Sequence, residues 1–146
     1  MTTSTHDEIL VGAIAIRPRI EPAETDGVIA IHEFDVPAGT SLPIPHSHDA
    51  YEETIYGVKG TVTFTLDGTP YDIGPGATLF IPREAIHAFA NTGHVDATAL
   101  AIITPGLLGA DYFREVAAVL DAAAGGPPDL AAIGDVMRRH GLTPAT

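Results

Sequence analysis

Three histidines and one carboxylate are spaced so that they could bind a single metal ion. His46 and His48 are separated by one residue, and in an extended chain two such side chains project from the same face. Glu53 follows a short stretch that could turn, and His87 stands further along the chain, on what would be a separate strand. Such a donor set leaves one or two positions open on a six-coordinate ion, as a catalytic metal needs. The alternative is that the histidine pair lies on an exposed polar hairpin loop.

The absence of cysteine narrows the chemistry of such a site. The sequence contains no cysteine, which excludes disulfides, thiolate zinc sites and a cysteine nucleophile. Histidine nitrogen and carboxylate oxygen suit iron, manganese, nickel, cobalt, copper or zinc. The expected cofactor is therefore one divalent transition metal ion of unspecified identity. No Ser-His-Asp order, glycine-rich phosphate loop or paired-carboxylate motif offers a competing site.

The spacing around the histidine pair resembles the first sequence motif of the cupin superfamily. In this chain His48 is followed by four residues, Glu53, six residues and Gly60, as in that motif. Gly39, at the start of the motif, lies one residue further from the pair than is usual. Glu52 competes with Glu53 for the ligand position, but Gly60 favours Glu53 because it completes the six-residue gap. Glu52 would then point outward into solvent.

A second stretch resembles the second cupin motif. It reads Gly76, five residues, Pro82-x-Glu84, two residues, His87, three residues, Asn91. Only Glu84 departs from the family pattern, which has glycine there, and this leaves the shape of one turn open. The resemblance implies an all-β fold, a double-stranded β-helix (jelly-roll) barrel, with a metal ion held by His46, His48, Glu53 and His87.

A finer resemblance concerns the chemistry. Several short segments look like single-domain cupins related to quercetin-type dioxygenases: Pro82-Arg83, Ile86-His87, Thr104-Pro105-Gly106 and the Asp111-Tyr112-Phe113-Arg114-Glu115 run. The resemblance implies a metal-dependent dioxygenase. In it Glu53 would also be catalytic, because it would move away from the metal and act as a general base. Two alternatives stay open. One is a non-redox cyclase, isomerase or lyase of the polyketide-cyclase kind, using the ion as a Lewis acid. The other is a small-molecule-binding cupin without turnover.

Strand parity predicts which residues line a substrate pocket. Ile55 and Gly57 share parity with Glu53 and are expected on the same inward face. The missing side chain at Gly57 would leave room for substrate, or else it marks a simple bulge. Phe64 and Phe89 have the parity to line the same interior. This apolar lining predicts a small hydrophobic or aromatic substrate.

Two further polar residues have competing interpretations. His32 could line the mouth of the barrel, but a structural or surface histidine is the favoured interpretation. Arg83 could steer an anionic substrate, and pairing with Glu84 is favoured instead.

The elements that position these residues are mostly strands. Alternating apolar residues with Gly and Pro between them predict short strands near 9–16, 28–36, 54–58, 61–66, 71–73, 78–81, 86–91 and 97–103, with a tight turn at Asp67-Gly68. Helical spacing predicts two C-terminal helices, at 111–124, where Asp111 could be the cap, and at 129–140, ended by Gly141.

Length and composition predict one domain. The 146 residues are 45% hydrophobic and carry a formal net charge of −12, which disfavours nucleic acid and anionic lipid as partners. No apolar run is long enough to cross a bilayer, and no signal pattern is present, so a cytoplasmic location is expected. Residues 1–8 are expected to form a flexible tail, 9–106 the barrel and 107–146 a helical extension. Because sheet edges need protection, we expect a homodimer.

Overall fold

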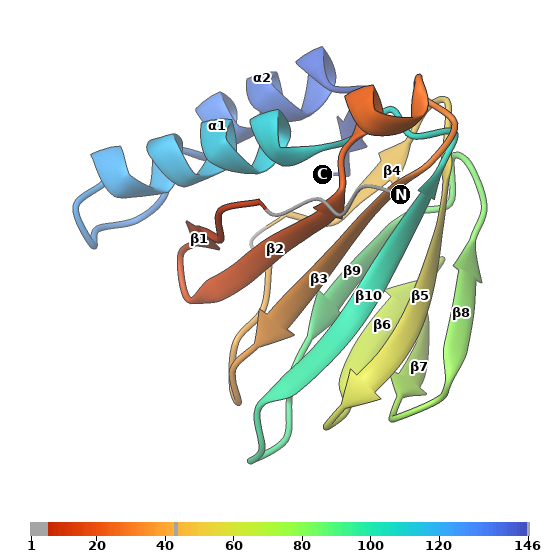
Figure 1. Cartoon of the computed structure of the whole chain (residues 1–146). Coiled ribbons are helices and arrows are strands. Elements are labelled where there is room, and N and C mark those ends of the chain that lie inside the picture. The colour runs from red at the N-terminus through yellow and green to blue at the C-terminus, as the bar shows by residue number, and fades with distance from the viewer. Residues whose placement is uncertain (1–5, 43, 146) are drawn as a thin grey trace.

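A computed structural model describes residues 6–42 and 44–145, and it contains two antiparallel sheets with two helices at one end (Figure 1). The larger sheet has the order β1-β2-β3-β10-β5-β8 and the smaller one β11-β4-β9-β6-β7. This arrangement is the predicted jelly-roll barrel. The larger sheet is made of β1 (Ile9–Val11), β2 (Ile14–Ile20), β3 (Ala30–Val36), β5 (Glu52–Lys59), β8 (Thr78–Ile81) and β10 (Ala97–Thr104). The smaller sheet is made of β4 (His46–His48), β6 (Val62–Leu66), β7 (Thr69–Ile73), β9 (His87–Ala90) and β11 (Leu142–Pro144).

The core forms between the two sheets because their strands alternate in burial. Along β3 and β10 every second side chain is buried, as expected when one face of a sheet packs on a core. Phe34 from the larger sheet packs against Phe89 of the smaller one, with ring centroids 5.2 Å apart. Phe89 in turn contacts Phe64 at 5.3 Å. The Phe34–Phe89 contact therefore joins the two sheets, while the Phe89–Phe64 contact lies within the smaller one.

The turns largely follow the sequence signals. At the β6–β7 hairpin, Asp67 and Gly68 have φ values of 47° and 85°, the left-handed conformation that a two-residue hairpin turn requires. The predicted turn is therefore confirmed. The segment 9–16 was predicted as one strand, and this is wrong. The chain reverses at Gly12, with φ of 60°, so that β1 and β2 pair as a hairpin.

The two predicted helices are present as α1 (Ala110–Ala122) and α2 (Leu130–Arg139). Asp129 caps α2, since its side chain accepts a hydrogen bond from the Ala132 backbone N–H at 3.0 Å. The predicted cap at Asp111 is wrong because Asp111 already lies within the first turn of α1. The first free N–H of α1 donates instead to the carboxylate of Glu21, which lies just before a short 3-10 turn, η1 (Pro22–Thr25).

Strands β4 and β11 are not among the strand ranges predicted from the sequence, although an extended chain was expected at His46 and His48. β11 follows α2 and pairs antiparallel with β4, placing Leu142 opposite His48 and Pro144 opposite His46. The proposed boundary at residue 107 between barrel and extension stays a prediction. Of the predicted tail, residues 1–5 lie outside the described residues. Across the part of the chain that the structure describes, neither helix has the length and apolar character to span a membrane.

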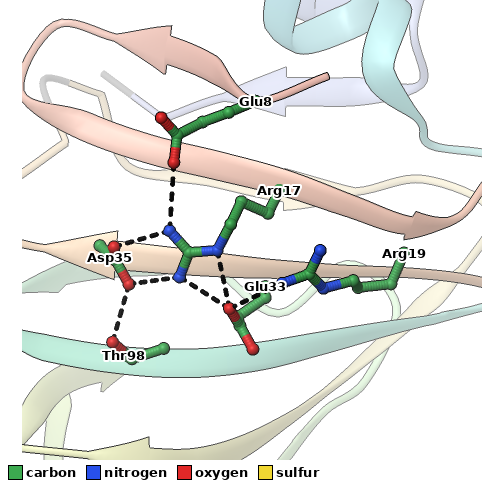
Figure 2. A network of polar contacts seen from close by, with 6 residues as sticks. All are labelled: Glu8, Arg17, Arg19, Glu33, Asp35 and Thr98. Carbon is green, nitrogen blue, oxygen red and sulfur yellow. Dashed lines mark hydrogen bonds and ion pairs between the residues drawn. The ribbon is translucent and has the colours of Figure 1, made fainter. Parts of the chain in front are cut away.

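The face of the larger sheet opposite the core carries a charged network (Figure 2). Arg17 on β2 donates to both carboxylate oxygens of Asp35 on β3, at 2.7 and 2.6 Å, and to Glu33 at 2.7 Å. The other members of the network are Glu8, Arg19 and Thr98. A bidentate arginine–carboxylate pair of this kind is stronger than a single surface contact. The network therefore fastens β2, β3 and β10 together.

This network predicts a stability that depends on pH. Hydrogen bonding to Arg17 lowers the pKa of Asp35 from its ordinary value of 3.8, although burial alone would raise it. The ionised carboxylate therefore stabilises the fold above about pH 4, and this contribution is lost as the pH falls through the lowered pKa. We expect Asp35→Asn to reduce the free energy of unfolding at pH 7 by about 1 kcal/mol.

Urea unfolding between pH 2 and pH 7 would measure this. The stability of Asp35→Asn should change less over the acid range than that of the wild type, while Asp121→Asn, on the exposed face of α1, should follow the wild-type curve. Parallel curves for the wild type and Asp35→Asn would contradict the assignment.

Candidate metal centre

Three of the predicted ligands meet inside the barrel on the smaller sheet. β4 carries His46 and His48, and β9 begins with His87, which pairs directly opposite His46. One ring nitrogen from each lies within 4.8 Å of the others. All three histidines are buried, with between 2% and 7% of their surface exposed. The structure therefore brings together side chains that are up to forty-one positions apart in sequence.

Backbone carbonyls orient two of these rings. Nδ1 of His46 lies 3.2 Å from the carbonyl oxygen of Ile44, and Nδ1 of His87 lies 3.0 Å from that of Ala85. Because a carbonyl can only accept, each Nδ1 must carry the proton and donate. Nε2 is then left with its lone pair free, which is the tautomer that a metal ligand needs.

The fourth predicted ligand comes from the larger sheet. Glu53 on β5 is 9% exposed, and its Oε2 lies 3.4 Å from Nε2 of His87 and 3.8 Å from Nε2 of His48. Burial alone would raise the pKa of Glu53, but its contact with His87 and the nearby histidines lower it to about 2. Glu53 therefore supplies a permanent negative charge beside the three rings.

The protonation states fit a metal site. Burial lowers the pKa of His46 to about 3 and that of His48 to about 4, so both rings are neutral at physiological pH. The carboxylate of Glu53 raises the pKa of His87, against the effect of burial. Nε2 of His87 and Nδ1 of His48 are fully buried and have no hydrogen-bond partner among the described residues. A divalent cation would supply the missing partner at His87 and balance the charge of Glu53, so the residues present fit a metal ion.

The neighbouring glutamate does not belong to the site. Glu52 points away from the histidines and forms an ion pair with Arg83, whose Nε lies 2.8 Å from its Oε2. The predicted pairing of Arg83 with Glu84 is therefore wrong. The pairing of β5 with β8 places Glu52 next to Arg83 instead. The turn in which Glu84 replaces a glycine keeps a glycine-like conformation, with φ of 67°. Its backbone N–H donates to the carbonyl of His48 at 2.8 Å.

Sequence reasoning missed a tyrosine behind the metal ligands. The ring of Tyr51 stacks on that of His48, with centroids 4.6 Å apart and planes inclined by 25°. Its hydroxyl donates to the carbonyl of His140, at the end of α2, at 3.2 Å. Tyr51 is 1% exposed. No motif signals this contact, because its partner lies 89 residues away in the sequence.

A cavity beside the metal ligands lies between the two sheets. Residues of both sheets and of helix α1 line it, and they include all four predicted ligands. Its wall is mostly aliphatic and aromatic and includes Phe64 and Phe89, which therefore line the interior, as predicted. Helix α1 closes one side with Tyr112, Phe113 and Val116. The C-terminal extension thus covers the cavity.

Two residues predicted for the pocket do not line this cavity. Ile55 is completely buried in the core. At Gly57 the space expected for substrate is taken by the loop after β7, since an added Cβ would lie 2.0 Å from the carbonyl oxygen of Gly74. The register between β5 and β10 also shifts here, because Ala99 pairs with Gly57 and Thr98 with Lys59. Gly57 therefore accommodates a bulge and a close backbone approach.

His32 lines the cavity, contrary to the favoured interpretation. It is 8% exposed, and its ring packs edge-on against Phe113 with centroids 4.8 Å apart. Parity on β3 was the available signal, since His32 lies on the same face of the strand as the buried residues Ala30 and Phe34.

The cupin domain family matches residues 32–103, a span that includes all four predicted ligands. The chain carries a cupin domain. Quercetin 2,3-dioxygenase from Bacillus subtilis (strain 168) is 27% identical over 108 residues, which are 74% of this chain and 31% of that protein. The dimethylsulfoniopropionate lyase DddW from Ruegeria pomeroyi is 39% identical over 67 residues, which are 46% of this chain and 41% of the lyase. The chain therefore spans less than half the length of these curated relatives.

Solved structures show the same cupin fold. The polyketide cyclase RemF from Streptomyces resistomycificus superimposes with a TM-score of 0.60 at 22% identity. The superposition covers 76% of this chain and 89% of the cyclase. At this identity the likeness concerns the fold alone, and the relatives of this cupin domain carry out several different reactions.

Proposed function

We propose that the protein is a metal-dependent dioxygenase that acts on a small hydrophobic or aromatic substrate. The observation that carries this proposal is the meeting of a largely apolar cavity with a buried set of three histidines and one glutamate. The sequence relationship to a quercetin 2,3-dioxygenase supports the same reaction class.

The residues divide into ligands and a proton acceptor. His46, His48 and His87 would hold the ion, with Glu53 as the fourth ligand. When bound, the ion would polarise a substrate hydroxyl and supply the redox chemistry with O2. Glu53 is ionised and sits at the edge of the cavity, so it can accept the proton of that hydroxyl. The apolar walls orient the substrate body and exclude water from the reacting atoms.

Oxygen consumption tests the proposal. The full chain is stripped of metal, reconstituted separately with iron, manganese, nickel, cobalt, copper and zinc, and incubated with quercetin and with catechol in an oxygen-electrode cell. We expect one O2 consumed per substrate cleaved with at least one redox-active ion, and at least 100-fold less activity in Glu53→Gln. Glu52→Gln, which changes the neighbouring carboxylate outside the site, is the matched control and should keep its activity. If every metal form leaves O2 untouched with these substrates, the dioxygenase assignment is wrong.

A non-redox lyase, isomerase or cyclase is the second candidate. The 39% identity with the lyase DddW favours it, and the same site could polarise a carbonyl without O2. Turnover of dimethylsulfoniopropionate by the zinc form under nitrogen would support this candidate.

A further inference from the structure

Two polar side chains on the cavity wall have no hydrogen-bond partner among the described residues. His32 on β3 and Tyr112 on α1 both line the cavity, and only 8% and 7% of their surfaces are exposed. Within the described part of the chain, neither the His32 ring nitrogens nor the Tyr112 hydroxyl form a hydrogen bond. Their polar atoms are not among the fully buried unpaired side-chain atoms of the described residues, so they keep access to the cavity space. Each therefore offers a free hydrogen-bonding group to a molecule that occupies the cavity.

Aromatic packing holds both groups in place. Phe113 contacts each of them, with ring centroids 4.8 Å from His32 and 5.1 Å from Tyr112. Phe34 contacts His32 from the other side at 5.9 Å. Both polar groups therefore belong to one rigid aromatic part of the wall, formed where α1 covers β3.

The charge of the cavity limits what these groups can recognise. No Lys or Arg is found among the described residues that line it, and Glu53 contributes a negative charge. Apart from a metal ion, the wall therefore offers no lysine or arginine to form an ion pair with a carboxylate or phosphate. Burial lowers the pKa of His32 to about 4 and raises that of Tyr112. At neutral pH the wall thus offers a neutral imidazole, which can donate and accept, and a neutral phenol.

We propose that His32 and Tyr112 form a polar recognition point for an uncharged hydroxyl or carbonyl group of the substrate. The inference rests on the proposed function in taking this cavity as the substrate chamber, and it narrows the substrate class. The substrate is an aromatic or other apolar compound with two oxygen functions. One reaches the metal centre, and the other binds the His32–Tyr112 pair.

Binding of two probes to the full chain tests the pair without any turnover. The probes are 2-naphthol and naphthalene, which share an apolar body and differ by one hydroxyl. Their affinities are measured by probe fluorescence on protein treated with EDTA, so that no metal contributes, and again on the metal-loaded protein. In metal-free protein we expect 2-naphthol to bind about tenfold more tightly than naphthalene. Tyr112→Phe and His32→Phe should each reduce this ratio to about two, with the affinity for naphthalene changed less than twofold.

Tyr71→Phe is the matched control, because Tyr71 is 43% exposed on β7 and lies outside the cavity. Its ratio should equal that of the wild type, and thermal melts would verify that all variants are folded. An unchanged ratio in both cavity variants, or no binding of either probe, would overturn the inference. Since the metal-free measurement needs neither metal nor O2, the pair can be confirmed even if the protein proves not to be a dioxygenase. If the protein proves to be a dioxygenase but both substitutions leave the ratio of the two affinities unchanged, the inference about His32 and Tyr112 is refuted and the proposed function is not.

Discussion

A divalent transition metal ion is expected to stabilise the metal-free protein strongly. At a free ion concentration 100 times the Kd, the free energy of unfolding should rise by about 2.7 kcal/mol, because the ion binds the folded chain and not the unfolded one. The physical reason is the state of the site: two neutral imidazoles, a third beside an ionised carboxylate, and buried nitrogens without partners. Thermal or urea unfolding with and without each ion measures the effect.

His48→Ala should remove most of this stabilisation. Its ring is the second donor on β4, and without it we expect the metal affinity to fall by at least about 100-fold, more than the loss of an outer hydrogen-bond partner. The quantity compared is the rise in the free energy of unfolding when metal is added. The stability without metal cannot be compared directly, because the loss of stacking on Tyr51 will itself lower it. His94→Ala, at an exposed histidine in a turn, is the control and should keep the full gain. An equal gain in His48→Ala, or no gain in the wild type with any of the six candidate ions, would refute the metal centre.

The second large effect is expected at Gly57. Alanine there would place its Cβ 2.0 Å from the Gly74 carbonyl oxygen and 2.8 Å from the carbonyl carbon. This backbone cannot move aside easily, because Gly57 is hydrogen-bonded to the same loop through Ala77 and Gly76, both at 2.9 Å. We expect Gly57→Ala to reduce the free energy of unfolding by about 3 kcal/mol, at the upper end of the cost of overpacking.

Gly74→Ala is the matched control for this close contact. The new Cβ would meet only the Thr61 hydroxyl oxygen, at 3.6 Å, which is an ordinary contact. Gly74→Ala should reduce the free energy of unfolding by less than about 1 kcal/mol. Urea unfolding of the two variants side by side gives the comparison, and similar stabilities would show that the loop yields to the added methyl group.

Local patterns were sufficient to predict most of the strands and the candidate ligands. Alternation identifies β6 and β10 because one face of each packs on the core, and the His-x-His spacing places two rings on one face of β4. The same parity argument put Gly57 on the correct face of β5. It could not show that the loop after β7 already fills the space. Parity predicts which face of the sheet a residue lies on, but not which residues pack against it.

The features that the sequence did not reveal all depend on partners distant in the chain. Tyr51 stacks on the predicted ligand His48, but its hydroxyl is held by the carbonyl of His140. Arg83, which follows β8, forms an ion pair with Glu52 at the start of the neighbouring strand β5. A structural or surface histidine was the favoured interpretation of His32, and only the packing of α1 over β3 shows that it lines the cavity. β11 is three residues long, too short to show any period of its own.

The pairing of β11 with β4 has a consequence for the order in which the protein is assembled. Among the described residues, β4 is paired with β9 through His46 and His87, and along its other edge its backbone partner is β11. A hydrogen bond from Thr143 to Asp49 adds to that edge and joins residues 94 positions apart. A nascent chain that has just emerged through His87 thus contains every candidate ligand, yet its ligand strand still lacks one neighbour. The complete pairing of β4 therefore requires residues 142–144 and can form only after they have been synthesised.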